Sequence, residues 1–151
     1  MDKIYFEIDP KEENGKPVYM ARFQVSDLPR AEQFNLDLAE RAGYLERLYK
    51  DTIMFCRAGL EKIKKAPSEK RILMYWDVAN KIWEYLEISE KKGFFFNNYY
   101  KHFIRDLHVS RTTIKRLLRL RKTVEDKSNL DPTKSWVYYT RRYVRLKSKQ
   151  P

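Results

Sequence analysis

The stretch that decides the fold spans residues 94–122 and reads FFFNNYYKHFIRDLHVSRTTIKRLLRLRK. Apolar residues recur in it at helical spacing on either side of a short turn: Phe103, Ile104 and Leu107 before the turn, and Ile114, Leu117 and Leu118 after it. Val109 can fill the corner between the helices, and Ser110 can accept a hydrogen bond from a backbone N–H of the next turn, as an N-cap does. The spacing therefore predicts a helix-turn-helix.

The predicted corner contains no glycine. One residue of such a corner usually adopts a positive φ, which glycine tolerates best, and here His108 stands in that place. We therefore expect His108 to adopt the left-handed conformation. Ile104 stands where the two helices approach most closely, and we expect it to push the second helix outward.

The exposed face of the second predicted helix carries no acidic residue. At about 100° per residue, one arc of roughly 140° collects Arg111, Thr112, Lys115, Arg116, Arg119 and Lys122. Arg and Lys bind guanine edges and phosphates, while Thr bonds bases or contacts a thymine methyl. Any solvated helix can carry charges, but a face of a single sign favours a DNA groove. We predict DNA contacts from this arc, with Ser110 and Thr113 at the helix start.

The excess positive charge lies in the last third of the chain. The protein has 151 residues and a net charge of +11; residues 1–100 hold 17 basic and 17 acidic residues, and residues 101–151 hold 15 and four. A directional field of this kind favours a polyanion such as nucleic acid or an acidic membrane surface. An aromatic content of 15% and this length predict a single domain, residues 1–151, with a packed core.

The sequence offers little for catalysis or export. The chain has a single cysteine, Cys56, so it can form no intrachain disulfide, and this cysteine usage predicts a protein of the reducing cytoplasm. The apolar neighbours of Cys56 predict that it is a buried residue. No run of 18 apolar residues and no signal-peptide pattern is present, so we expect a soluble protein. There is no glycine-rich phosphate loop, no metal-ligand spacing and no suitable carboxylate pair. We therefore predict no metal, no cofactor and no catalytic residue.

The first part of the chain predicts a β-hairpin and a helical core. Residues 1–26 alternate in polarity around Asn14-Gly15, with Ile4, Phe6 and Ile8 on one side. Two strands are marginally stable alone, so the hairpin must pack on the helices or pair with a second copy, which would make a homodimer.

Residues 27–92 predict two helices. The first is expected to start near Ser26 or Asp27, to run to about residue 66 and to break near Gly43 or Gly59. Ser68 is expected to cap the second. The fold class is therefore mainly α, a helical bundle that contains a helix-turn-helix and an N-terminal β-hairpin.

Residues 131–149 predict a basic C-terminal helix. Asp131-Pro132 reads as an N-cap followed by proline at the first helical position. One acid-free arc of roughly 80° collects Lys134, Tyr138, Arg141, Arg142, Arg145 and Lys149. Of these, Tyr138, Arg141, Arg142 and Arg145 are predicted to contact DNA, the arginines through phosphates and the tyrosine against a sugar or base.

Three segments, in this order, resemble the helical N-terminal domain of the YhcG family of nucleases: ILMYWDV at 72–78, SRTTI at 110–114, and Ser135-Trp136 with Tyr138 or Tyr139 and Leu146-Lys147. The resemblance covers about residues 40–148. Ala79 stands where that family usually has glycine, the histidine of its last motif is missing, and the hairpin has no counterpart. The family's nuclease portion follows this domain, so the resemblance implies DNA binding, without a catalytic residue, and a nuclease or other protein partner acting in trans.

The function that the sequence favours is a DNA-binding regulator or an accessory protein of a mobile element, plasmid or virus. Three alternatives stay open. The aromatic FFFNNYY segment and Tyr138 would suit an RNA-binding module. The basic surface would also suit an adaptor that binds an acidic protein. The spacing of His102 and Arg105, with Tyr138, Tyr139 or Tyr143 as nucleophile, would suit tyrosine-based strand transfer, but two histidines in the chain are few for such a site. We therefore expect no enzyme.

Overall fold

The computed structural model describes residues 4–23 and 36–143 of the chain. Its elements are β1 (Ile4–Glu13), β2 (Lys16–Phe23), α1 (Leu36–Lys65), α2 (Ser68–Lys91), β3 (Phe94–Phe96), α3 (Tyr99–Leu107), α4 (Arg111–Thr123), η3 (Lys127–Asn129) and η4 (Tyr138–Tyr143). The mainly α class and the N-terminal hairpin are thus confirmed. None of the described helices combines the length and apolar character needed to cross a lipid bilayer.

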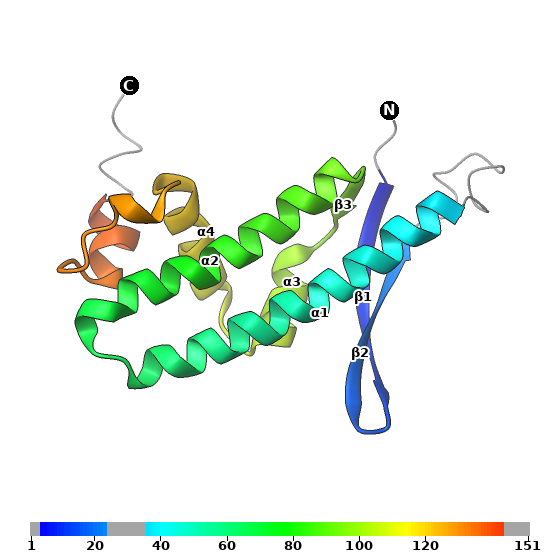
Figure 1. The fold of residues 1–151 in the computed structure, drawn as a ribbon, viewed down its shortest axis with the longest axis horizontal. Helices are drawn as coiled ribbons and strands as arrows, with labels where there is room; N and C mark the ends of the chain where they lie inside the picture. Colours follow the sequence, from blue (N-terminus) through cyan, green and yellow to red (C-terminus); the bar gives the residue numbers. More distant parts are fainter. Residues whose placement is uncertain (1–3, 24–35, 144–151) are drawn as a thin grey trace.

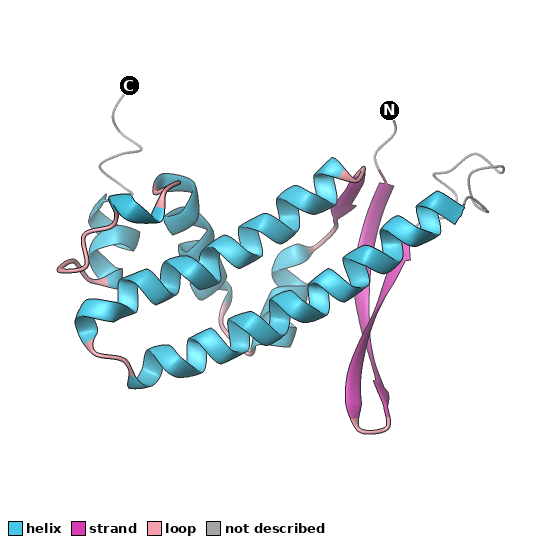
Figure 2. Ribbon diagram, viewed as in Figure 1, coloured by secondary structure: helices cyan, strands magenta, loops and turns pink. Residues whose placement is uncertain are grey.

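Two long antiparallel helices, α1 and α2, form the spine of the molecule (Figure 1). The strands gather at one end of this spine, and α4 with the segments that follow it lies at the other end (Figure 2). The break expected near Gly43 or Gly59 is wrong, because α1 continues through both glycines. The predicted start of this helix, near Ser26 or Asp27, lies outside the described residues.

Small residues let α1 and α2 approach closely. A Cβ atom added to Gly59 would lie only 2.8 Å from Cγ2 of the buried Val78. One turn earlier, the Cys56 thiol is fully buried and lies 3.7 Å from the Val78 carbonyl oxygen. Burial raises the pKa of the Cys56 thiol to about 12, which fits the expected inert core residue.

The sheet has the strand order β2-β1-β3. Strands β1 and β2 are antiparallel and joined by a two-residue turn in which Asn14 and Gly15 both have positive φ, as a type I′ hairpin requires. The predicted inward residues Ile4, Phe6 and Ile8 are buried. The third strand comes from the same chain, because β3 pairs with β1 in parallel at Ile4–Phe6. The hairpin therefore packs within its own chain, and the homodimer stays a prediction.

Strand β3 corrects the boundaries of the predicted helix pair. Residues 94–96 were included in the helix-turn-helix, but they are extended and Phe94 and Phe96 point into the core. The core centres on Tyr49, whose ring centroid lies within 5.1–5.7 Å of the rings of Tyr19, Tyr85, Phe96 and Phe103. Aromatic contacts thus join the sheet, α1, α2 and α3.

Two predicted helix N-caps are wrong, although α2 begins at Ser68 as expected. Ser68 is the first residue of α2 and makes no side-chain cap; Pro67 holds the N-cap position. Asp131 and Pro132 lie in a loop, where Oδ1 of Asp131 accepts hydrogen bonds from the backbone N–H and hydroxyl of Thr133. This local bonding competes with a helix, and helical backbone begins only at residue 136. The rest of the predicted helix beyond residue 143 lies outside the described residues.

The two glycines of α1 predict opposite effects of alanine. Gly59→Ala should lower the free energy of unfolding by about 1 kcal/mol, since overpacking costs about 1–3 kcal/mol and the gain in helix propensity offsets only part of it. Gly43→Ala is the matched control, because its Cβ would meet only the Arg47 guanidinium at 3.5 Å. It should stabilise the protein by about 0.5–1 kcal/mol. Urea denaturation measures both, and equal effects would contradict the close approach at Gly59.

Candidate nucleic-acid interface

Helices α3 and α4 are joined by a three-residue turn with the expected geometry. His108 has φ 56° and ψ 45°, as predicted, and its backbone N–H donates to the Ile104 carbonyl at 3.1 Å. Ser110 is the N-cap of α4, and its Oγ accepts the Thr113 N–H at 3.1 Å. The position and the cap of the turn are therefore confirmed, while its role as a DNA-binding helix-turn-helix stays a prediction.

The inner face of α4 is fixed against α2. Its fully buried residues are Ile114, Leu117 and Leu120. Leu120 joins a second apolar cluster with Ile72, Trp76, Val124, Leu130 and Tyr139. The indole N–H of Trp76 donates to the Val124 carbonyl at 2.7 Å and so holds the C-terminal end of α4. The helix is therefore presented on a packed support.

The outer face of α4 carries the predicted basic arc. Four of its basic residues are exposed, namely Arg111, Lys115, Arg119 and Lys122, together with Thr112; Arg116 and Thr113 are half-buried. Within the part of the chain that the structure describes, no side-chain hydrogen bond or ion pair is made by Lys115, Arg116, Arg119 or Lys122. No acidic residue occurs in the helix. The arc is therefore a surface of uncompensated positive charge.

One arginine of α4 has a structural role instead. The Arg121 guanidinium donates to the Asn80 side chain at 2.8 Å and lies 5.6 Å and 5.3 Å from the ring centroids of Trp76 and Trp83. These contacts use its charge to hold α4 on α2. Arg121 lies off the predicted arc, so the sequence wheel separates the structural arginine from the exposed ones.

The residues of the predicted C-terminal helix that were expected to contact DNA are described only in part. Tyr138 is half-buried in η4, with the Lys134 ammonium 5.2 Å from its ring centroid. η4 contacts α4 through the apolar cluster that contains Leu120 and Tyr139, and Tyr138 packs against this cluster. The side chains of Arg141 and Arg142, and the whole of Arg145, lie outside the described residues.

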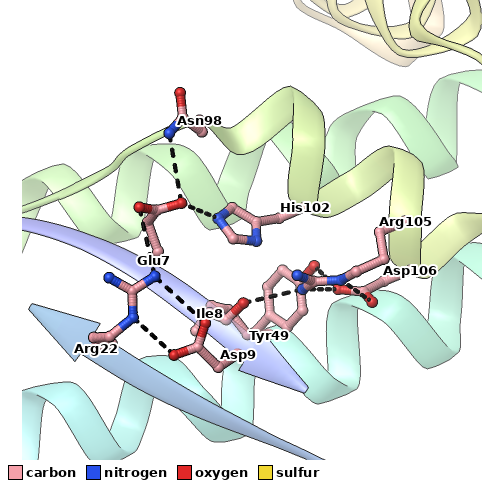
Figure 3. A network of polar contacts seen from close by, with 9 residues as sticks. All are labelled: Glu7, Ile8, Asp9, Arg22, Tyr49, Asn98, His102, Arg105 and Asp106. Carbon is pink, nitrogen blue, oxygen red and sulfur yellow. Dashed lines mark hydrogen bonds and ion pairs between the residues drawn. The ribbon is translucent and has the colours of Figure 1, made fainter.

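A buried carboxylate, Asp106, holds α3 against α1 and the sheet (Figure 3). Asp106 accepts a hydrogen bond from the Tyr49 hydroxyl of α1 and a bidentate pair from Arg105 at 2.9 and 2.8 Å. Arg105 also donates to the Ile8 carbonyl of β1 at 3.0 Å. From α1, Arg57 donates to the Asp106 carbonyl at 2.6 Å. Asp106 thus ties α3 to both α1 and the sheet.

A second cluster of polar side chains joins α3 to the part of the hairpin where Glu7 of β1 pairs with Arg22 of β2 (Figure 3). Oε1 of Glu7 lies 3.0 Å from Nε2 of His102 and 3.5 Å from Nδ2 of Asn98. Arg22 on β2 pairs with Asp9 at 2.8 Å. Burial tends to raise the pKa of Glu7, but hydrogen bonds from His102 and Asn98 outweigh burial and lower it.

His102 is held in its neutral form by burial. Its side chain is 2% exposed and stacks on Phe96 with the ring centroids 5.0 Å apart. One ring nitrogen faces Glu7, while Nδ1 is buried without a partner among the described residues. Protonation would place a donor at Nδ1 with no acceptor, so burial lowers the pKa of His102 even though Glu7 is close.

Three of the residues named for strand transfer, His102, Arg105 and Tyr139, make structural contacts in the described part of the chain. His102 faces Glu7 and Arg105 faces Asp106, so both position α3. The Tyr139 hydroxyl is buried and accepts the Asp131 N–H at 2.6 Å. No group of His, Cys, Asp or Glu in the described ranges, 4–23 and 36–143, is arranged to hold a metal ion.

The structure also brings together residues that the sequence did not connect. Tyr5 on β1 lies beside Phe95, because β1 and β3 pair in parallel, and both lie near Tyr99 and Tyr100 of α3. The aromatic run pointed to Tyr99 and Tyr100, but no local pattern pointed to Tyr5. Comparison with protein-family models, curated proteins and solved structures finds no match for this chain. The resemblance to the YhcG family therefore stays a prediction.

Removing the charge of Asp106 should destabilise the protein. Asp106→Asn leaves the Arg105 guanidinium without its carboxylate, and because Arg105 keeps 33% of its side-chain exposure we expect a loss of about 3 kcal/mol, at the lower end for a buried pair. Glu61→Gln is the control, since it makes the same change in the exposed pair with Lys64. It should cost less than about 0.5 kcal/mol in urea denaturation. A similar cost for both variants would contradict the role of Asp106.

His102 predicts a pH dependence of stability. Its pKa is lowered in the folded protein, so below about pH 6.5 the unfolded chain binds the proton more readily. The free energy of unfolding should therefore fall as the pH decreases from about 7 to about 5.5, a range above the titration of the carboxylates. His102→Gln should remove most of this fall, as followed by urea denaturation at each pH. An equal fall in both proteins would show that another group is responsible.

Proposed function

We propose that this protein binds double-stranded DNA, with α4 in the major groove. The proposal depends on the outer face of α4. Its exposed charged side chains are all basic, and Lys115, Arg116, Arg119 and Lys122 have no side-chain ion pair or hydrogen bond in the described part of the chain. A helix of 13 residues is about 20 Å long, and the major groove admits an α-helix of this kind.

The residues divide into two roles. Those nearest the start and middle of the helix would meet base edges: Arg111, Thr112, Lys115, Arg116 and Arg119. Ser110 and Thr113 at the helix start would meet the backbone or bases, as would Tyr138. Lys122, with Arg141, Arg142 and Arg145 further along the chain, would bind phosphates.

The support beneath α4 favours this role. A helix that recognises bases in the major groove must keep its orientation while phosphates attract its charged side chains. The apolar cluster that contains Leu120, Trp76 and Val124 holds the inner face of α4. The turn before it is fixed through Asp106 and Arg57. The proposal extends to a regulator or an accessory protein of a mobile element, plasmid or virus that works in the cytoplasm as a homodimer, with a nuclease or other protein as a partner in trans.

Replacing two basic residues of α4 tests the proposal. Lys115→Ala with Arg119→Ala should weaken binding to a random duplex of about 30 base pairs by tenfold or more and reduce the slope of log affinity against log salt by about 2, because on a duplex without the specific site both cations would contact phosphates instead of base edges. Fluorescence anisotropy between about 50 and about 200 mM salt measures both quantities.

The matched control removes the same two charges elsewhere. Arg47→Ala with Lys50→Ala changes exposed residues of α1 and should leave the affinity and the slope almost unchanged. Equal weakening by both double variants would reduce the effect to net charge and contradict a role for α4. Failure of the unmodified protein to bind the duplex, or tighter binding to single-stranded RNA of the same length, would also overturn the proposal.

A further inference from the structure

A hollow of about 490 Å³ lies between β1, the end of α2 and the segment that joins β3 to α3, and Arg111 at the start of α4 borders it. Its aromatic lining consists of Tyr5, Phe95, Phe96, Tyr99 and Tyr100, and Arg111 of the basic arc also lines it. The size is within the range of small-molecule sites, which is about 300–1,000 Å³. The hollow therefore has room for a nucleotide and shares a residue with the proposed DNA surface.

The aromatic lining is built by the outer face of the sheet. Phe94 and Phe96 point into the core, so Phe95 between them points the other way, and its register partner Tyr5 lies on the same face. The Tyr5 ring is 6.0 Å from that of Phe95, and Tyr5 is 46% exposed. A single exposed tyrosine is common on protein surfaces, but Tyr5 and Phe95 form a contiguous aromatic pair with Tyr99 and Tyr100 nearby, and a contiguous apolar patch can mark a binding site.

Two stacked tyrosines at the start of α3 also line the hollow. The rings of Tyr99 and Tyr100 are 4.7 Å apart and tilted by 27°. The Arg111 guanidinium lies 4.9 Å from the Tyr100 ring centroid. Because Tyr99 and the Arg111 guanidinium both lie against Tyr100, an incoming base would extend this stack on the outer face of Tyr99 or of the guanidinium, two kinds of surface on which proteins stack unpaired bases.

The charges around the hollow favour an anionic, planar occupant. Lys101 and Arg111 supply positive charge, and Asn97 and Asn98 offer amide groups that can bond a base edge. Glu90 is the carboxylate among the lining residues, and it is exposed. A phosphate could bind near Lys101 and Arg111 while its base lies against the rings.

We propose that this hollow binds an unpaired nucleobase next to the duplex held by α4, an inference that rests on the proposed DNA binding. Bases within a duplex are stacked on each other and their faces cannot reach a protein ring. The occupant would therefore be a nucleotide of a single-stranded end or junction. Arg111 would link the two surfaces, since it belongs to both.

The experiment compares a blunt duplex of about 20 base pairs with the same duplex carrying a single-stranded extension of about five nucleotides, by fluorescence anisotropy. The unmodified protein should bind the extended duplex about 5- to 150-fold more tightly, the range that stacking of one base contributes. Tyr100→Ala and, separately, Tyr5→Ala should remove most of this ratio and leave blunt-duplex binding nearly unchanged. Because the ratio is internal to each protein, general destabilisation would not alter it.

Tyr44→Ala is the matched control. Tyr44 is also exposed and has an ammonium against its ring, that of Lys92 at 4.3 Å, but it lies on α1 outside the hollow. It should keep the full ratio. Tyr100→Phe should also keep it, since the ring and its stacking remain.

The outcomes separate this inference from the proposed function. If the unmodified protein binds the blunt duplex and the extended duplex equally tightly, the proposed binding of a base in the hollow is wrong, while duplex binding remains supported. Tyrosine-dependent binding of the extension without any binding of the blunt duplex would support the hollow and overturn the role of α4. A ribonucleotide extension on the same duplex identifies the source of the base. If it increases the affinity as much as the DNA extension does, only the base is recognised; if it increases the affinity more, the natural ligand is RNA.

Discussion

A carboxylate buried in a protein must be neutralised and hydrogen-bonded where it lies, and the position of α3 depends on how Asp106 meets this requirement. Tyr49 and Arg105 supply its partners, and Arg105 reaches on to the Ile8 carbonyl. A helix of nine residues has little stability alone. This cluster therefore holds α3 in place, and the left-handed His108 ends the helix and turns the chain toward α4.

The structure uses basic residues in two ways. Arg105 is neutralised by Asp106, Lys127 pairs with Asp77 at 2.9 Å, and Arg121 lies against two tryptophans. Each of these holds one element against another. The basic residues on the outer face of α4, such as Lys115 and Arg119, have no such partner among the described residues. They repel one another, and a bound anion would relieve this repulsion. This difference in use is the physical basis of the proposed DNA surface.

Local patterns predicted the parts of the fold that local forces decide. Spacing and side-chain chemistry gave the turn, the left-handed His108 and the Ser110 cap, and alternation gave the inward face of β1. Strand β3 could not be predicted, because three residues carry no periodicity and their pairing with β1 spans most of the chain. The aromatic hollow depends on that pairing and was missed with it. The loop at Asp131 was missed because its side chain bonds Thr133 instead of capping a helix.

The central claim is that α4 is the surface that meets DNA. Amide NMR spectra of the isotope-labelled protein, titrated with a random duplex at about 50 mM salt, test it residue by residue. The account predicts that the largest shifts occur from Ser110 to Lys122, while the tip of the hairpin at Asn14 and Gly15 stays unchanged. Shifts that are absent, or that concentrate on α1 or the hairpin instead of α4, would contradict it.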